Sequence, residues 1–148
     1  MSISKVLSKN KKAYFDYEIV DKYTAGIVLT GAEVKSVRGG GTALVGSYVS
    51  FRDGGVWLIG AKIRPYAYAR IENQDPDRPK KLLLTSREIS KLQGVVGQKG
   101  VTLIPLEVVL EGRYIKVIIG VCRGKKKWDK RETLKKRSIE KRLRQREL

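Results

Sequence analysis

Apolar and polar residues alternate along several stretches of this chain, which is the pattern of strands that bury one face. Aromatic and β-branched residues fill positions 14–29, where Asp21-Lys22 predicts a turn between two strands. The same pattern flanks Asp53-Gly54-Gly55, which suits a hairpin turn because glycine tolerates a positive φ. A last strand pair is predicted over 101–124, with its turn at Glu111-Gly112.

Two short helices are predicted by capping boxes, in which a threonine and a glutamate three residues later bond reciprocally across the first helical turn. Thr30 and Glu33 begin the first helix, which the glycines at 39–41 end. Thr85 and Glu88 begin the second helix, whose apolar residues recur at helical spacing.

The remaining stretches predict a long loop, a short strand and a proline at a sheet edge or a bulge. Residues 64–81 contain three prolines and no periodicity, and loops of this length are usually functional or flexible. The apolar run at 81–85 reads as a brief strand. Pro105 has no N–H to donate to a ladder, so we expect it at a sheet edge or a bulge.

These elements predict a fold that is mainly β (α+β), with six or seven short strands and two or three short helices. Strands do not alternate with long helices, so a parallel sheet is not expected. A small, partly open antiparallel barrel fits best, and the OB-fold is a common nucleic-acid-binding example, although the pattern does not determine the topology. We expect the barrel over 1–122, with a flexible N-terminal segment at 1–12.

Charge separates the last 26 residues from this barrel. The 148-residue chain has 32 Lys and Arg against 15 Asp and Glu, a formal net charge of +17 that indicates a polyanionic partner. Thirteen of the basic residues lie at 123–148, where few apolar residues are present to offset the entropy of ordering. We therefore expect a basic C-terminal tail that is disordered when free.

Few residues suit catalysis or metal binding. The chain has no histidine, which removes the usual general base and most zinc-site layouts, and Cys122 is expected to be an apolar strand residue. One cysteine and no apolar run of membrane-spanning length predict a cytoplasmic protein without a membrane partner. We expect no cofactor. Asp75 and Asp77 leave a metal-dependent RNA-processing enzyme as the alternative, although Asp-Pro segments usually form turns.

Positive charge interleaved with aromatic rings favours RNA as the partner. Lysine and arginine neutralise phosphates, and flat side chains stack on unpaired bases. Lys11 and Lys12 precede Tyr14, and a run of three lysines precedes Trp128. Each lysine cluster could instead be a solvated surface, whereas a large ring in a charged tail suggests a partner surface.

Ordered motifs resemble the SmpB family of bacterial transfer-messenger RNA (tmRNA)-binding proteins along nearly the whole chain. In order they are NKKAY, YTAGIVLTGAEVKSVR, SYV, DPDRPKKLLL, SREISKL, VTLIPLEV and GKKKWDKRE. The resemblance implies an OB-fold barrel and a tail that becomes helical on the ribosome. It implies that a monomer binds the tRNA-like domain of tmRNA and delivers it to stalled ribosomes for trans-translation, while the tail enters the empty mRNA channel and reaches the decoding centre.

The resemblance also assigns residues, position by position. Many family members have glutamate where this chain has Thr24, and Tyr or His where it has Trp128. The implied tmRNA-binding residues are Asn10, Lys11, Lys12, Thr24, Glu33, Lys35, Lys81 and Leu83. The implied ribosome-binding tail residues are Lys125, Lys126, Lys127, Trp128, Asp129, Lys130, Arg131, Lys135, Lys136 and Arg137. A ribosomal protein or an initiation-factor-like OB protein is the alternative among binding proteins.

Overall fold

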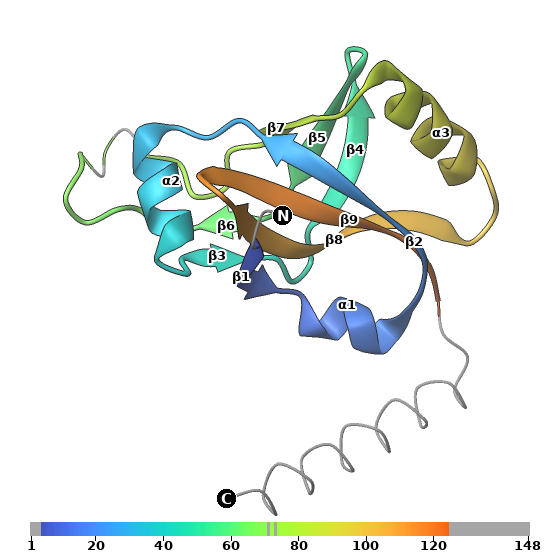
Figure 1. Cartoon of the computed structure of the whole chain (residues 1–148), viewed down its shortest axis with the longest axis horizontal. Helices are drawn as coiled ribbons and strands as arrows, with labels where there is room; N and C mark the ends of the chain where they lie inside the picture. The colour runs from blue at the N-terminus through green and yellow to red at the C-terminus, as the bar shows by residue number, and fades with distance from the viewer. Residues whose placement is uncertain (1–3, 71, 73, 125–148) are drawn as a thin grey trace, which may run out of the picture.

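The computed structural model describes residues 4–70, 72 and 74–124. Of the tail predicted at 123–148, Arg123 and Gly124 belong to the last strand, where they pair with Glu18 and Tyr17, and the remainder lies outside the described residues. Nine strands and three short helices are described (Figure 1). The strands are β1 (Ser4–Lys9), β2 (Tyr17–Ile27), β3 (Thr42–Ala43), β4 (Tyr48–Arg52), β5 (Gly55–Ile59), β6 (Lys62–Ile63), β7 (Lys80–Leu83), β8 (Val101–Glu111) and β9 (Tyr114–Gly124). The helices are α1 (Lys11–Asp16), α2 (Gly31–Arg38) and α3 (Ser86–Val96).

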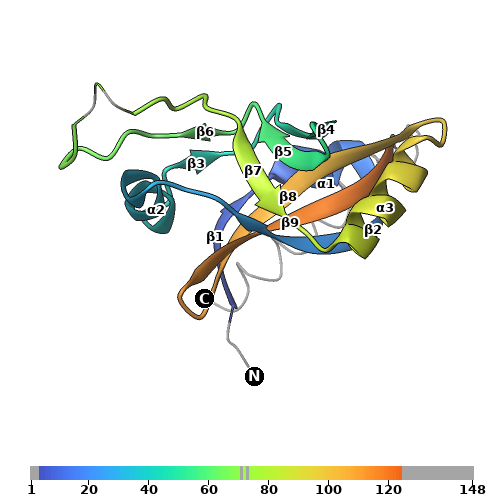
Figure 2. The same cartoon turned by 90° about the horizontal axis from the view of Figure 1, so that it is seen from above.

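Seven strands form one antiparallel sheet in the order β1-β8-β9-β2-β7-β5-β4, and β3 pairs with β6 in a small second sheet. The large sheet curls until β4, at one edge, contacts β8 near the other (Figure 2). The predicted mainly β, antiparallel fold with short helices is therefore confirmed. The strand pairs around Gly54 and Gly112 and both capping boxes are also where the sequence predicts them.

Apolar side chains from the concave side of the sheet form the main core, because alternate strand residues point to opposite faces. Val56, Val117 and Ile119 are fully buried there, and α3 adds Leu92 and α2 adds Val37. A second, smaller cluster lies on the convex side, where α1 packs on β8 and β9. Its buried members are Ala13, Ile104, Leu106 and Cys122.

The predicted hairpin within 14–29 is wrong. Residues 11–16 form α1, and β2 then runs without a turn through Asp21 and Lys22. Strand β2 pairs with β9 from Tyr17 to Gly26, with a bulge between Ile19 and Asp21. The long partner strand satisfies the backbone of β2, so the local turn signal is overridden.

The predicted flexible segment at 1–12 is wrong for residues 4–12. Strand β1 pairs with the outer edge of β8, and Asn10 begins α1. Tertiary pairing orders a segment whose own composition gives a weak strand signal. The same region explains Pro105, which lies at a bulge of β8 against β9, as its missing N–H predicts.

Two further sequence expectations can be compared with the described residues. Cys122 is fully buried in β9, and burial raises the pKa of its thiol to about 11, so its interpretation as an apolar strand residue is confirmed. Within the described part of the chain, none of the helices is long and apolar enough to cross a membrane.

Candidate nucleic-acid interface

A row of side chains crosses the convex side of the sheet from β5 through β7 and β2 to β9. Residues paired directly across strands share a face, and the pairs Trp57–Lys81, Gly26–Leu83 and Gly26–Lys116 connect four strands in this way. Thr24 is two residues from Gly26 and points to the same side. We call this surface the outer face, and its members are Thr24, Gly26, Trp57, Lys81, Leu83 and Lys116.

Strand β7 separates the outer face from the core by strict alternation. Leu82 is 2% exposed, whereas Leu83 is 52% exposed. Lys80 is fully buried, whereas its neighbour Lys81 is exposed. The expectation that only part of the leucine run belongs to the core is confirmed, and Lys81 and Leu83 are both free to meet a partner.

The buried Lys80 ties the loop after β6 to the barrel. Its Nζ donates hydrogen bonds to the carbonyl oxygens of Ala61 at 2.9 Å and Pro76 at 3.2 Å. Burial lowers the pKa of Lys80, since the charged form loses hydration, while Glu33 partly opposes the change. Lys80 therefore has a structural function that its sequence context, two consecutive lysines, did not indicate.

Glu33 is also buried and connects α2 to the same loop through Arg78. Its carboxylate accepts the Thr30 backbone N–H at 2.8 Å and forms an ion pair with Arg78. Burial would raise the pKa of Glu33, but the hydrogen bonds from Arg78 and Thr30 outweigh burial and lower it. The capping-box interpretation of Glu33 is confirmed, and little of its carboxylate remains for RNA.

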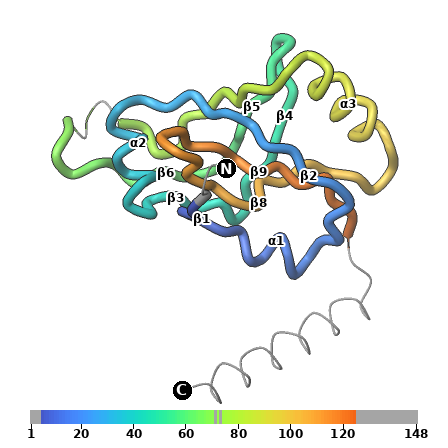
Figure 3. Tube along the Cα trace, in the orientation of Figure 1, coloured from blue at the N-terminus to red at the C-terminus, as the bar shows by residue number. Residues whose placement is uncertain are grey.

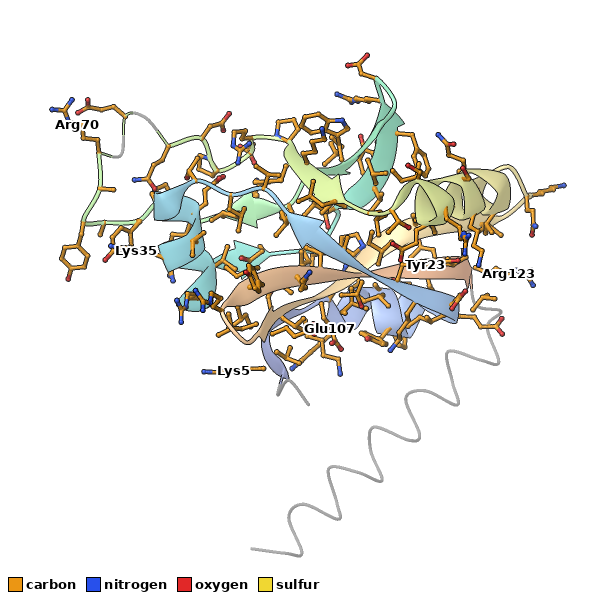
Figure 4. The ribbon with its side chains drawn as sticks, turned by 45° about the horizontal axis from the view of Figure 1, so that its top comes forward. Lys5, Tyr23, Lys35, Arg70, Glu107 and Arg123 are labelled. Atoms are coloured by element: carbon orange, nitrogen blue, oxygen red, sulfur yellow. The ribbon has the colours of Figure 1, made fainter. Side chains whose placement is uncertain are left out.

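Lys35, two residues further on α2, is exposed. Its Nζ lies 5.4 Å from the centre of the Tyr66 ring, within cation–π range. Figure 4 shows Lys35 at the same end of the molecule as Arg70 in the loop, whereas Arg123 marks the opposite end, where β9 finishes. Lys35 thus stands beside the loop that Glu33 and Lys80 fix in place.

Asn10 is buried and its side chain is committed to the protein. Its Oδ1 accepts the N–H of Ala13 at 3.1 Å, and its Nδ2 donates to the carbonyl oxygens of Pro105 at 3.1 Å and Leu44 at 3.4 Å. This is an N-cap that also fastens α1 to β8. Asn10 therefore positions its exposed neighbours Lys11 and Lys12 rather than presenting its own amide to a partner.

Lys12 borders a cavity of about 370 Å³ beneath α1. Tyr17 also lines this cavity and pairs with Gly124, the last residue of β9. Helix α1 covers the β8–β9 part of the convex side, at the bottom of Figure 1, while β7 lies at the top. The structure consequently separates Lys11 and Lys12 from the predicted residues on β2, α2 and β7.

Four predicted residues have exposed side chains on β2, α2 and β7, and strand pairing brings three of them together, while Lys35 lies apart on α2 beside the loop. The four are Thr24, Lys35, Lys81 and Leu83. The sequence did not indicate Trp57 and Lys116, which join this group through strand pairing, nor Lys80 and Arg78, which support it. Knowledge of the strand register would have identified Trp57 and Lys116. No local sequence signal distinguishes the buried Lys80 from the exposed Lys81. All predicted tail residues lie outside the described residues.

The aspartates that suggested a metal site form a turn. The Asp75 carboxylate accepts the backbone N–H of Asp77 at 2.9 Å. Within residues 4–70, 72 and 74–124, no group of three or more His, Cys, Asp or Glu residues is arranged to hold a metal ion.

Comparison with known proteins places this chain in a family. The family model described as SmpB protein matches residues 7–148. The chain belongs to the SmpB family. The SsrA-binding protein of Streptococcus mutans is 49% identical over 132 residues, covering 89% of this chain and 85% of the relative. The SsrA-binding protein of Synechococcus sp. (strain JA-3-3Ab) is 48% identical over 145 residues, covering 97% and 94%.

A solved structure agrees with the SmpB assignment. It is described as "tmRNA-SmpB: a journey to the center of the bacterial ribosome" and is 45% identical in sequence to this chain. The TM-score is 0.69, over 81% of this chain and 85% of the other. That chain therefore shares the fold described above, and the identification made from the ordered sequence motifs is confirmed.

Proposed function

We propose that this protein binds the tRNA-like domain of tmRNA and delivers tmRNA to stalled ribosomes. Membership of the SmpB family, its SsrA-binding relatives and the tmRNA–SmpB structure support this function. The feature of this chain that carries the proposal is the outer face, where the exposed Leu83 lies between Lys81 and Lys116 and the half-buried Trp57 lies beside Lys81. Cations beside apolar and aromatic surface suit phosphates next to unpaired bases.

The binding residues divide into contacts and supports. Thr24, Lys35, Lys81 and Leu83 are exposed and provide the RNA contacts, with Lys11 and Lys12 as a second basic group on α1. Asn10 and Glu33 act as positioning residues, because their side chains are buried and bonded within the protein. The charge of +17 attracts RNA over longer distances.

The C-terminal tail supplies the ribosome contact in this proposal. Its basic residues would follow phosphates in the empty mRNA channel, becoming helical there, and Trp128 would stack in the decoding centre. The barrel replaces the part of a tRNA that tmRNA lacks. The protein acts in the cytoplasm as a monomeric adaptor, one copy per tmRNA, without catalytic residues or cofactor.

A binding competition tests the RNA assignment. The full-length protein is titrated with the tRNA-like domain of tmRNA and with an unrelated tRNA at the same salt concentration, since charge alone binds any RNA. We expect a clear preference for the tRNA-like domain. Equal affinities would contradict the proposal.

A truncation tests the division between barrel and tail. Strand β9 continues to Gly124, which pairs with Tyr17, so the chain should be cut after Gly124 to keep the sheet intact. We expect tmRNA affinity to be largely kept and tagging on stalled ribosomes to be lost. Parallel loss of both activities would show that the two regions do not have separate functions.

A further inference from the structure

A groove of about 330 Å³ lies between α2 and the first part of the loop that follows β6. Figure 3 shows this loop extending past α2, away from the sheet. The volume is at the lower end of the range for small-ligand pockets. The residues that line the groove include two cations and no acid. They are Lys35, Ser36, Gly39, Arg64, Pro65, Tyr66, Ala67 and Tyr68.

Tyr68 presents an almost bare ring at the rim of this groove. It is 89% exposed, the largest value among the exposed large apolar residues described. Its ring meets the edge of Tyr66, with 5.4 Å between ring centres and 61° between planes. An exposed aromatic ring supported on one side leaves a face for another flat group.

The backbone at Arg64 and Tyr66 is fixed by Ser36 on α2 and by Gln74 on the returning arm of the same loop. The Gln74 amide accepts the N–H of Tyr66 at 2.6 Å and donates to its carbonyl oxygen at 3.1 Å. The Ser36 hydroxyl donates to the carbonyl oxygen of Arg64. The backbone N–H of Arg64 donates to the carbonyl oxygen of Gly41 at 2.7 Å. A loop held in this way loses little entropy when a ligand binds.

Charge favours an anionic occupant in the groove. Lys35 lies over Tyr66, and Arg64 and Arg70 are exposed on the same arm of the loop. The acidic residues Glu72, Asp75 and Asp77 follow on the returning arm. Asp75 there accepts a backbone N–H, and none of the three lines the groove.

We propose that this groove binds one unpaired nucleotide of the tRNA-like domain. This proposal rests on the proposed function. The base stacks on Tyr68, and Lys35 and Arg64 contact the flanking phosphates. Tyr66 supports the stacking ring, while Gln74 and Ser36 are positioning residues. The tmRNA, rather than ribosomal RNA, is the occupant. The groove shares α2 with the predicted tmRNA residue Lys35, and α2 lies at the opposite end of the molecule from the end of β9, which leads into the tail (Figure 1).

Three variants of the full-length protein test the stacking contact. Tyr68→Ala should weaken binding of the tRNA-like domain by about 5- to 150-fold, the range measured for removal of a base–aromatic stack. Tyr68→Phe keeps the ring and should bind like the wild type. Tyr114→Ala is the matched control, because Tyr114 is 64% exposed at the β8–β9 turn, and it should also leave binding unchanged.

The same titrations at several salt concentrations test the phosphate contacts. Arg64→Gln should reduce the slope of log affinity against log salt by about 1, and Tyr68→Ala should leave the slope unchanged. Equal binding by Tyr68→Ala and Tyr68→Phe would overturn the nucleotide site. If those variants bind equally while the wild type still prefers the tRNA-like domain, the proposed function stands and only the groove assignment fails.

A photo-crosslinking amino acid at position 68 identifies the occupant. In complexes containing tmRNA and ribosomes, we expect the crosslink to map to an unpaired nucleotide of the tRNA-like domain. A crosslink confined to ribosomal RNA, to a protein or to a base-paired nucleotide would overturn the assignment. Thermal unfolding of each variant confirms that the barrel is intact, which the exposure of Tyr68 leads us to expect.

Discussion

Helix α1 packs on the convex side of the sheet, whereas α2 adds Val37 to the main core, and each has a buried polar side chain in or next to its first turn. At α1, Asn10 bonds to neutral carbonyl groups of Leu44 and Pro105. At α2, Glu33 pairs with Arg78 from a loop more than forty residues away in sequence. The Asn10 cap of α1 thus bonds to neutral groups, and Tyr14 in the same helix donates to the Glu107 carboxylate at 2.9 Å, whereas the α2 region combines an ion pair with the buried Lys80.

The difference shows how the arrangement of exposed side chains can depend on buried polar residues beneath them. Around α2, buried charges hold the loop that carries Tyr66 beside Lys35, so losing a support should disturb several contacts together. Around α1, the exposed lysines belong to the helix that Asn10 caps, and the effect of a lost cap should stay local.

Removal of Lys80 should give the largest effect on stability. Lys80→Ala leaves a cavity and removes both hydrogen bonds of Nζ, so we expect a loss of about 3–5 kcal/mol in the free energy of unfolding. Urea denaturation measures this loss. Lys81→Ala is the matched control on the exposed side of β7 and should change stability by less than about 0.5 kcal/mol.

Lys80→Met separates packing from hydrogen bonding. The thioether fills most of the same volume, and Pro76 still accepts the N–H of Ile63 at 3.1 Å, so most of the stability should return. A methionine variant as unstable as the alanine variant would show that the ammonium, rather than packing, accounts for the effect.

Removal of the Asn10 side chain should have the next largest effect. Asn10→Ala loses an N-cap and two buried hydrogen bonds, and we expect about 2–3 kcal/mol less stability. Hydrogen exchange of α1 amides should rise while α2 amides stay protected. Increased exchange in both helices would contradict the independence of the two regions.

Glu33 should make stability depend on pH in the acidic range. Its pKa in the folded protein is lowered below the ordinary 4.5, so it contributes stability above that pH and loses the contribution as pH falls through the folded pKa. Unfolding free energies measured from pH 5 downward should fall more steeply for the wild type than for Glu33→Gln. At neutral pH the variant should lose about 1–2 kcal/mol. If the unfolding free energies of the wild type and of Glu33→Gln change with pH in parallel, the Glu33–Arg78 ion pair does not contribute to stability.

Leu83 should give the smallest effect on stability. Leu83→Ala removes a side chain that is already half exposed, so stability should change by about 0.5 kcal/mol or less, whereas Leu82→Ala should cost about 2–5 kcal/mol. Binding of the tRNA-like domain by Leu83→Ala should fall by a factor of about 5, as expected for about 1 kcal/mol of contact. Unchanged affinity would exclude Leu83 from the interface.

Sequence reasoning succeeded where one local signal acts alone. Both capping boxes, the turn at Gly54 and the bulge at Pro105 follow from the chemistry of a few neighbouring residues. It failed at Asp21-Lys22 and at residues 4–9, where a distant strand supplies the hydrogen bonds. The contact partners of Glu33, Asn10 and Lys80 could not be predicted for the same reason, because each depends on segments far apart in the chain.

Strand β9 has mechanical consequences for whatever the C-terminal extension engages. It has β8 on one side and β2 on the other up to Arg123. Traction applied at Gly124 along the strand would therefore shear two ladders together rather than peel one strand from an edge. A pull on the extension would be transmitted to the centre of the sheet and, through β2, to the strand that borders β7.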